Sequence, residues 1–384
     1  MDKITSINPE VLKWARKRSN ITSDKIIQTM GDERYLLWEN GNDFPTYVQL
    51  EKLMSLYNYP IAISFFSTLP DIEDNKVNFR TIPNEVIDSV DYLIIRLVNQ
   101  AKAFQLYLDE IYQISGESPR NSLLTKSLDN QSMENLILIF KDKVLNMDLL
   151  KRKHKSSKEY FDYLRDSLFE LGIYVFKDSF HNESVAGFCI YHEMYPVIYI
   201  NNKVSLTRQL FTLFHELYHL IRRTNGIDFL FDDFLKNYKY DLTVEFECNS
   251  FAAKFLVPKE DLAKEVKSYG NDFDAIGKIA NHFLVSRDVI ARRMFDLGFL
   301  SYEDYFESKK IFEMDYVRVQ HASDSKQKGD YYNTQMSYLG NKYLELVYRE
   351  YYKKNITLLD LSRYTNLKYS SLVQVANRKN WQKV

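Results

Sequence analysis

Two histidines and a glutamate stand close together in the mostly apolar stretch 211–221. In an α-helix, positions i and i+4 lie one above the other, so His215 and His219 can present both imidazoles to one metal ion. Glu216 lies about 100° further around the helix. From there its carboxylate can reach a metal-bound water without being a ligand. The pattern therefore predicts a metal site with an adjacent general base.

This H-E-x-x-H spacing is the arrangement of zinc hydrolases, in which the glutamate acts as general base. The alternative is that His215 and His219 are ordinary, partly buried histidines, because short motifs also occur by chance. The leucines and phenylalanines around them predict that the helix is mostly buried. Buried polar groups are costly unless they are paired, so their presence here favours the metal site.

A zinc site with two histidines needs at least one more protein ligand, and a catalytic site also leaves one position open for water. A downstream helix ending near Pro258 carries Glu245 on the same stripe as Asn249 and two alanines. The alanines allow close packing, which brings Glu245 to the metal and lets Asn249 orient a ligand. Glu247 and Cys248 remain alternative ligands, although we expect Glu247 in solvent and Cys248 in the core.

These segments together resemble the ImmA/IrrE family of metallopeptidases. The resemblance rests on F-T-L-F-H-E-L-x-H-L, on E-x-x-C-N-x-F-A-A-x-x-L-x-P downstream, and on the strand and turn at 196–202 before them. It implies Glu216 as the catalytic residue. It also implies three zinc ligands, which agree with the helical geometry: His215, His219 and Glu245.

Three expectations concern the substrate cleft. Tyr218 stands where glycine is common in the family, and its bulk is expected to narrow the cleft. Tyr195 and Tyr240 lie in predicted loops and are candidate partners for an oxyanion. An extended substrate is expected to add a strand to the edge of a small sheet near 196–200.

The composition is that of an ordinary globular protein with more than one domain. The chain has 384 residues, of which 45% are hydrophobic and 27% charged, and its 11 glycines and 8 prolines favour helices over long linkers. Its two cysteines fit a reducing compartment. We find no secretory signal core and no apolar run of about 18 residues, which predicts a cytoplasmic protein without a membrane span.

Apolar periodicity predicts an α+β, mainly helical fold. Three short strands, at 173–176, 185–191 and 196–200, are expected before the H-E-x-x-H helix. The predicted domains are a four-to-five-helix helix-turn-helix domain (1–68), a helical connecting region (80–156), a zincin-like zinc metallopeptidase domain with the small β-sheet (157–305) and a helical, basic C-terminal region (306–384).

The first 60 residues are predicted to form four short helices, beginning at Asn8-Pro9, at Thr22, near 32 and near Thr46. The series I-T-S-D-K-I-I-Q-T-M-G, L-W-E-N-G and F-P-T resembles the Xre type of helix-turn-helix in phage repressors. That resemblance implies that the third helix, 32–40, binds DNA in the major groove. Residues 1–60 carry eight basic and eight acidic side chains, however, so contact with a protein or a structural use stays open.

The C-terminal region has an excess of basic residues and is a better electrostatic candidate for DNA contact than the N-terminal domain. Residues 340–384 contain nine lysines and arginines against three acids, and 356–376 resembles a second helix-turn-helix pair. The alternative is a solvated basic surface, since charge runs usually face water. The candidate DNA-binding residues of the two ends are Arg34, Arg363, Lys368, Arg378 and Lys379.

These patterns together predict a zinc-dependent endopeptidase fused to a helix-turn-helix domain. The family resemblance implies a regulatory protein as substrate, such as a repressor, cleaved to control stress, mobile-element or phage-related genes. One alternative is a DNA-binding regulator or antitoxin-like protein whose zinc site is structural or sensory. Another is a scaffold with a silent peptidase fold. An oligomer is possible.

Overall fold

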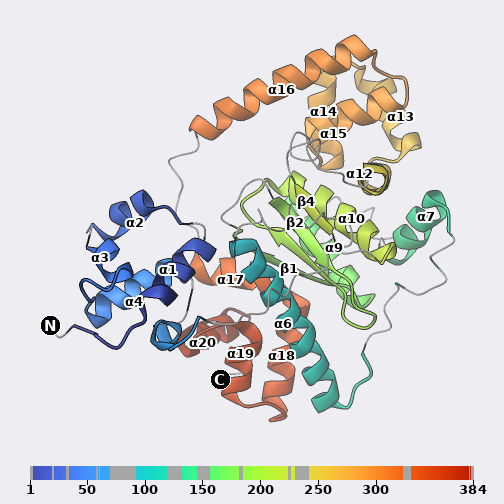
Figure 1. Ribbon diagram of the computed structural model, residues 1–384. Helices are drawn as coiled ribbons and strands as arrows, with labels where there is room; N and C mark the ends of the chain where they lie inside the picture. Colours follow the sequence, from blue (N-terminus) through green and yellow to red (C-terminus); the bar gives the residue numbers. More distant parts are fainter. Residues whose placement is uncertain are drawn as a thin grey trace. The chain divides into compact units, whose positions relative to one another are not determined.

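The computed structural model divides the chain into two compact units (Figure 1). One comprises 1–77 with 84–99, and the other 78–83 with 100–384. We describe each unit by itself. The structure describes residues 3–19, 21–31, 34–57, 59, 61–69, 92–119, 124, 128, 131–144, 156–180, 185–223, 226–229, 242–322, 330–379 and 381.

The first unit is a set of short helices around a small aromatic core. They are α1 (Pro9–Arg18), α2 (Ser23–Met30), α3 (Tyr35–Glu39), α4 (Tyr47–Leu56) and the 3-10 helix η1 (Ile61–Phe65). As predicted, Asn8 caps α1, and its side chain accepts a hydrogen bond from the Glu10 amide at 3.0 Å. The third helix is shorter than predicted, and its expected acidic start at 32–33 lies outside the described residues.

A buried ion pair explains the W-E of the L-W-E-N-G series. Trp38 and Glu39 are 1% and 3% exposed, and Glu39 accepts hydrogen bonds from Arg16 Nε at 2.8 Å and the Tyr57 hydroxyl at 3.1 Å. These bonds join α3 to α1 and to the residue after α4. The pair therefore stabilises the helices against one another, and the two residues face the core.

The second unit is built on a four-stranded mixed sheet of order β1-β3-β2-β4. Its strands are β1 (Tyr174–Asp178), β2 (Val185–Ile190), β3 (Val197–Asn201) and β4 (Gly226–Phe229). The small sheet and the three predicted strands are confirmed, whereas β4 was missed. Because β3 pairs with β1 on one side and β2 on the other, the expected addition of a substrate strand near 196–200 is wrong.

Helices cover both faces of this sheet, which explains its nearly continuous apolar strands. Val175 and Ile198 pack into one core cluster with α10 (Leu206–Ile221) and α9 (Ser157–Glu170). Phe176 points to the opposite face, where it stacks on Phe104 of α6 (Tyr92–Ser115) at 4.0 Å between centroids. There it also meets Tyr343 of α18 (Asn341–Tyr352). The sheet is thus the middle of three layers.

The remaining helices of the second unit lie around these layers (Figure 1). They are α7 (Met133–Val144), α12 (Leu242–Leu256), α13 (Lys259–Tyr269), α14 (Phe273–Phe283), α15 (Arg287–Asp296), α16 (Tyr302–Ala322), α17 (Tyr331–Leu339), α19 (Leu358–Thr365) and α20 (Tyr369–Arg378). Among the described residues, none of the helices is both long and apolar enough to cross a membrane.

A buried arginine ties the C-terminal helices to the sheet. Arg165 of α9, 4% exposed, donates to the Val175 carbonyl of β1 at 2.7 Å and to the carbonyls of Ser337 and Tyr338 at 2.6 and 2.7 Å. The last two belong to the final turn of α17, where carbonyls lack helical partners and cations are favoured. Gly340 has φ +83, and a Cβ there would lie 2.5 Å from the Arg165 guanidinium carbon.

Candidate metal centre

The central helix α10 carries both histidines and lies between the sheet and α12. Ser205 caps it, accepting a hydrogen bond from the Arg208 amide at 3.3 Å. Every residue from Gln209 to Ile221 is buried. The sheet can approach closely because β2 has a glycine, Gly187, where a Cβ would lie 2.6 Å from the Thr212 methyl. As a result His215, Glu216 and His219 are at most 1% exposed.

Three potential ligands converge between α10 and α12. The Nε2 atoms of His215 and His219 are 3.3 Å apart. Glu245 of α12 places Oε2 3.1 Å from the Nε2 of His215 and Oε1 3.3 Å from that of His219. Zinc bonds of 2.0–2.1 Å in a tetrahedral arrangement hold neighbouring donors about 3.3 Å apart. The spacing of these three side chains therefore fits a tetrahedral zinc site.

The electrostatics of Glu245 also fit a ligand. Burial acts to raise its pKa, but the close imidazoles of His215 and His219 outweigh burial and hold the pKa well below its usual range. The carboxylate is therefore ionised, as metal binding requires. Its Oε1 atom is buried and accepts no hydrogen bond from the described residues. A cation between the three side chains would satisfy this oxygen.

Asn249, one turn after Glu245, contacts the first histidine. Its Oδ1 lies 3.1 Å from the Nδ1 of His215. If the amide oxygen accepts the Nδ1 proton, the lone pair of Nε2 points toward Glu245 and His219, which is the tautomer that a metal ligand needs. The structure thus brings together His215, His219, Glu245 and Asn249, as the helical spacing predicted, while their roles in binding stay predictions.

Cys248 lies nearer to this cluster than the sequence suggested. It is fully buried, as expected of a core residue. Its sulfur and one nitrogen from each of His215 and His219 also lie within 4.8 Å of one another. The oxygens of Glu245 are closer to the histidines, at 3.1 and 3.3 Å, so distance favours Glu245 as third ligand and makes Cys248 a neighbouring donor.

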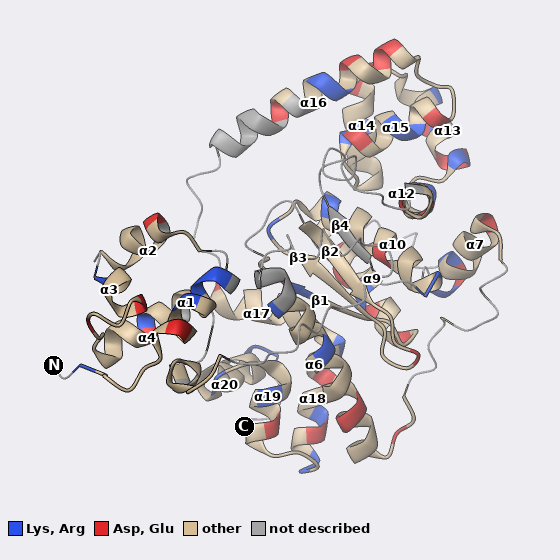
Figure 2. Ribbon diagram, in the orientation of Figure 1, with Lys and Arg blue, Asp and Glu red and all other residues tan. Residues whose placement is uncertain are grey.

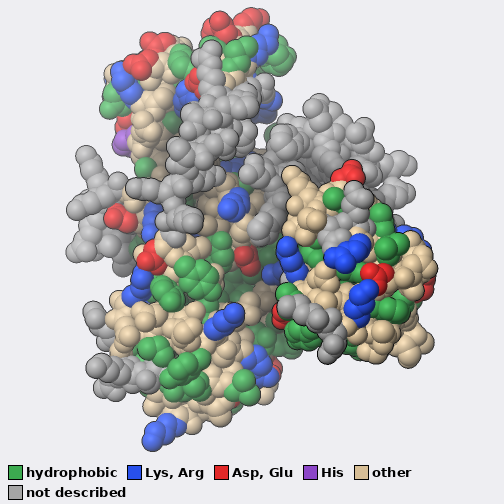
Figure 3. All heavy atoms as spheres, turned by 90° about the vertical axis from the view of Figure 1, so that its left-hand side faces the viewer, with side chains coloured by type: hydrophobic (Ala, Val, Ile, Leu, Met, Phe, Trp, Pro, Cys, Tyr) green, Lys and Arg blue, Asp and Glu red, His purple; other side chains and the backbone are tan. Residues whose placement is uncertain are grey.

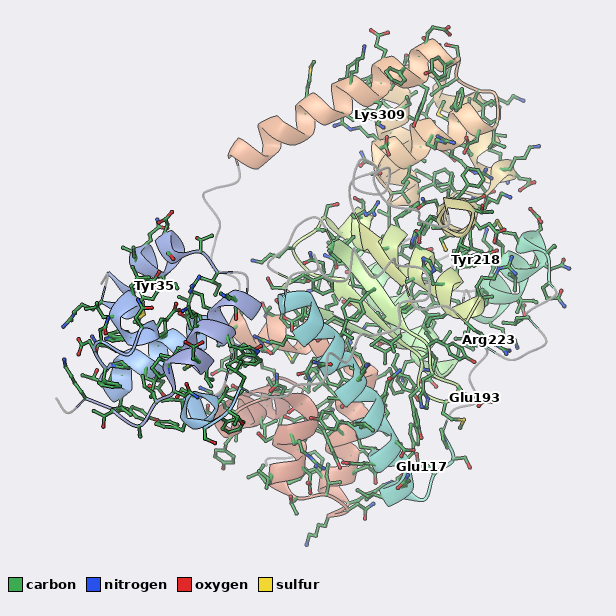
Figure 4. The ribbon with its side chains drawn as sticks, in the orientation of Figure 1. Tyr35, Glu117, Glu193, Tyr218, Arg223 and Lys309 are labelled. Atoms are coloured by element: carbon green, nitrogen blue, oxygen red, sulfur yellow. The ribbon has the colours of Figure 1, made fainter. Side chains whose placement is uncertain are left out.

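Tyr218 and Glu247 form a hydrogen bond between α10 and α12, which the sequence analysis did not predict. The Tyr218 hydroxyl donates to Glu247 Oε2 at 2.9 Å, and Arg222 donates to both partners at 3.1 Å (Tyr218 is labelled in Figure 4). Burial and the bond to Glu247 raise the pKa of Tyr218 to about 12. Glu247 is therefore paired rather than merely solvated, and Tyr218 is 1% exposed and packs on Phe251 instead of narrowing an open cleft.

Replacing Tyr218 by phenylalanine tests this connection between α10 and α12. Loss of the hydroxyl leaves Glu247 with one donor fewer, so the free energy of unfolding should fall by about 1–2 kcal/mol. Metal affinity should fall by roughly 10-fold, because α12 carries Glu245. Urea denaturation and competition with a chelator measure the two effects. Tyr369→Phe, at a tyrosine that is 60% exposed, is the control. Equal stability of the two variants would show that the connection contributes nothing.

Of the two tyrosines expected to stabilise an oxyanion, the structure describes only Tyr195, which lies away from the histidines. The Tyr195 hydroxyl donates to Asp109 of α6 at 3.1 Å, which puts it on the face of the sheet opposite α10. The expectation for Tyr195 is therefore wrong. Tyr240 lies outside the described residues, so its expected role stays a prediction.

Three of the four predicted DNA-binding cations of the C-terminal region bind acidic or polar partners within the second unit. Arg363 Nη2 is 2.6 Å from Glu110 Oε2 of α6, and Arg378 donates to both oxygens of Asp330 at 2.9 Å. Lys379 donates to Asn341, whereas Lys368 is exposed at the start of α20. Basic and acidic residues accordingly stand side by side on α18 and α19 (Figure 2).

The described basic side chains form no single patch on the face drawn in Figure 3, where they are interspersed with acidic and hydrophobic ones. Arg34 of the first unit is exposed just before α3. The helix pair expected at 356–376 is present as α19 and α20, joined through Asn366 in the left-handed conformation at φ 54. DNA binding by Arg34 and by the four C-terminal residues remains a prediction.

Comparison with known families supports the peptidase part of the sequence interpretation. Residues 169–295 match the model of the IrrE N-terminal-like domain, a peptidase family (M78). The match covers about a third of the chain and contains all four strands, α10 and α12. It supports a metallopeptidase-like domain of the ImmA/IrrE family there, and it does not extend to the first unit or to α17–α20. A comparison with curated proteins finds no match.

Proposed function

We propose that this chain is a cytoplasmic zinc-dependent endopeptidase. The observation that carries the proposal is the buried set of His215, His219 and Glu245, whose donor atoms lie 3.1–3.3 Å apart. Two imidazoles and one carboxylate are the protein ligands of well-known zinc peptidase sites, which keep a fourth position open. The match of this segment to a peptidase family supports the same conclusion.

His215 and His219 would hold the cation, and Glu245 would supply the negative charge of the ligand set. A zinc ion there would polarise the scissile carbonyl and make a water molecule more acidic. Glu216 would accept the proton from that water and deliver it to the leaving amine. Asn249 fixes the orientation of His215, so that its Nε2 atom does not turn away from Glu245.

Loss and return of metal test the proposal. The purified full-length chain is expected to contain about one zinc ion and to cleave some members of a diverse peptide library, with products read by mass spectrometry. Treatment with a chelator should abolish cleavage, and added Zn²⁺ should restore it, because the ligands are buried side chains that persist in the folded protein. Cleavage that is unaffected by complete removal of the metal would contradict the proposal.

The substrate that we propose is a regulatory protein such as a repressor. This rests on the resemblance of residues 160–260 to the ImmA/IrrE family and on the fusion of the peptidase segment to a separate unit of short helices. Cleavage would change transcription of stress, mobile-element or phage-related genes. Identifying the proteins that accumulate when Glu216 is replaced by glutamine in cells would name the substrate.

A DNA-binding regulator with a structural or sensory zinc site is the second candidate. It is favoured by the four short helices of the first unit, whose sequence resembles the Xre helix-turn-helix, and by the exposed Arg34 before α3. Gel shifts of the full chain at two salt concentrations test it. If these residues contact phosphates, Arg34→Ala or Lys368→Ala should weaken binding and lower the salt dependence by about one ion each. If both variants bind DNA with the same affinity and salt dependence as the unmodified chain, these contacts are excluded.

A further inference from the structure

We propose that Cys248 is an additional metal donor, which converts the open site of three ligands into a closed site of four. The inference rests on the proposed function, since it concerns the same cation. In the closed form the sulfur takes the position that water needs, so molecules in this form would not cleave. The activity of the unmodified chain would then be that of its open fraction. Cys248 is thereby a built-in inhibitory ligand rather than an inert core residue.

The helical position of Cys248 puts it in the sector of α12 that faces the histidines. It follows Glu245 by three residues, which turns it about 60° away around the helix, while Asn249 is turned about 40° to the other side. Glu245 and Asn249 both contact His215. Cys248 is fully buried on the other side of Glu245 from Asn249, and its sulfur lies within 4.8 Å of a nitrogen of each histidine.

Only a small movement separates this arrangement from ligation. Zn–S bonds of about 2.3 Å and Zn–N bonds of about 2.0 Å place the sulfur and nitrogen of a tetrahedral site about 3.5 Å apart. The sulfur and the two nitrogens are at most 4.8 Å apart, so ligation requires each of these distances to shorten by about 1.3 Å at most. The buried Oε1 of Glu245, which accepts no hydrogen bond from the described residues, indicates that this space is arranged for a cation.

The chemistry of the thiol determines what the movement does. A thiol loses its proton to solvent when it binds a metal, and the thiolate is a preferred ligand of zinc. Closed sites of four protein ligands are typical of structural zinc, whereas catalytic sites have three. The carboxylate of Glu245 and the thiolate of Cys248 together would therefore hold the metal tightly and exclude water.

Cobalt tests the inference independently of catalysis. The full-length protein is loaded with Co²⁺, and its near-ultraviolet spectrum is recorded, because a thiolate ligand produces a sulfur-to-cobalt charge-transfer band. We expect the band in the unmodified protein and its complete loss in Cys248→Ala. The matched control is Cys189→Ala, at the other cysteine of the chain, which is buried on β2 in the same core cluster and should keep the band.

Peptide cleavage provides a second measurement. If the thiolate closes the site, zinc-loaded Cys248→Ala should cleave library peptides severalfold faster than the unmodified protein. Thermal unfolding of both alanine variants shows whether they remain folded, and Cys248→Ser replaces Cys248→Ala if that variant unfolds. Bound Co²⁺ without a charge-transfer band would overturn the role of Cys248 and leave the proposed function intact. A chain that binds neither Co²⁺ nor Zn²⁺ would overturn both.

Discussion

Replacement of Glu216 by glutamine is expected to abolish peptide cleavage while the metal stays bound. Glutamine has nearly the same size, so the buried helix α10 keeps its packing and both histidines keep their positions. The amide cannot accept a proton from water or return one to the leaving amine. Positioned acid–base groups contribute about 10²–10⁴-fold to rates, so cleavage should fall by at least this factor.

Metal content and cleavage must be measured on the same Glu216→Gln preparation. Elemental analysis should give the same zinc content as the unmodified protein, and mass spectrometry of a peptide library should give no products. Glu260→Gln, on the exposed side of α13, controls for the loss of one charge. Equal, measurable cleavage by the two variants would show that Glu216 is not the base. Bound zinc with no cleavage by the unmodified protein would favour a structural or sensory site.

The geometry of the candidate site follows from the sequence because it depends on two helices. The 3.6-residue period fixes which side chains share a face, so His215 and His219 had to stand together, as did Glu245 and Asn249. The remaining requirement was that the two helices touch. Ala252 and Ala253 of α12 made close packing predictable, and Ala252 lies fully buried in the shared core cluster.

The helical period also predicts that Cys248 lies near the histidines, although Cys248 was expected to be only a core residue. A residue three positions after Glu245 lies on nearly the same face, so Cys248 had to lie near the histidines if Glu245 did. Glu247 was missed for another reason. It lies about 200° from Glu245, but the long side chains of Tyr218 and Arg222 reach around α10 to meet it.

Sheet order and long-range pairing were beyond the sequence argument. Three strands were recognised from their β-branched and aromatic residues, but their local sequence does not determine that β3 is central and that β4 follows α10. The ion pairs of the basic C-terminal region could not be predicted for the same reason. Its net charge was counted within 340–384, whereas Arg363 and Arg378 pair with Glu110 and Asp330 outside that range.

Replacement of Glu245 by alanine is expected to weaken zinc binding by more than about 100-fold, since losing a ligand should exceed the 10–100-fold cost of losing an outer partner. Asn249→Ala gives the matched intermediate effect, because it removes only the contact with His215 at 3.1 Å. Competition with a chelator of known affinity measures both variants and the unmodified chain. If Glu245→Ala binds zinc as tightly as the unmodified chain, either Glu245 is not a ligand or Cys248 holds the metal without it. A double variant separates these two causes.

Cys248 is the reason that the single Glu245→Ala variant is not decisive. With the carboxylate gone, two histidines and the thiolate still form a three-donor site. The double variant Glu245→Ala with Cys248→Ala leaves only His215 and His219, and zinc should be lost completely at micromolar protein. If the double variant keeps its zinc, neither residue of α12 is a ligand, and the metal is held elsewhere. If only the single variant keeps zinc, the thiolate holds the metal without the carboxylate.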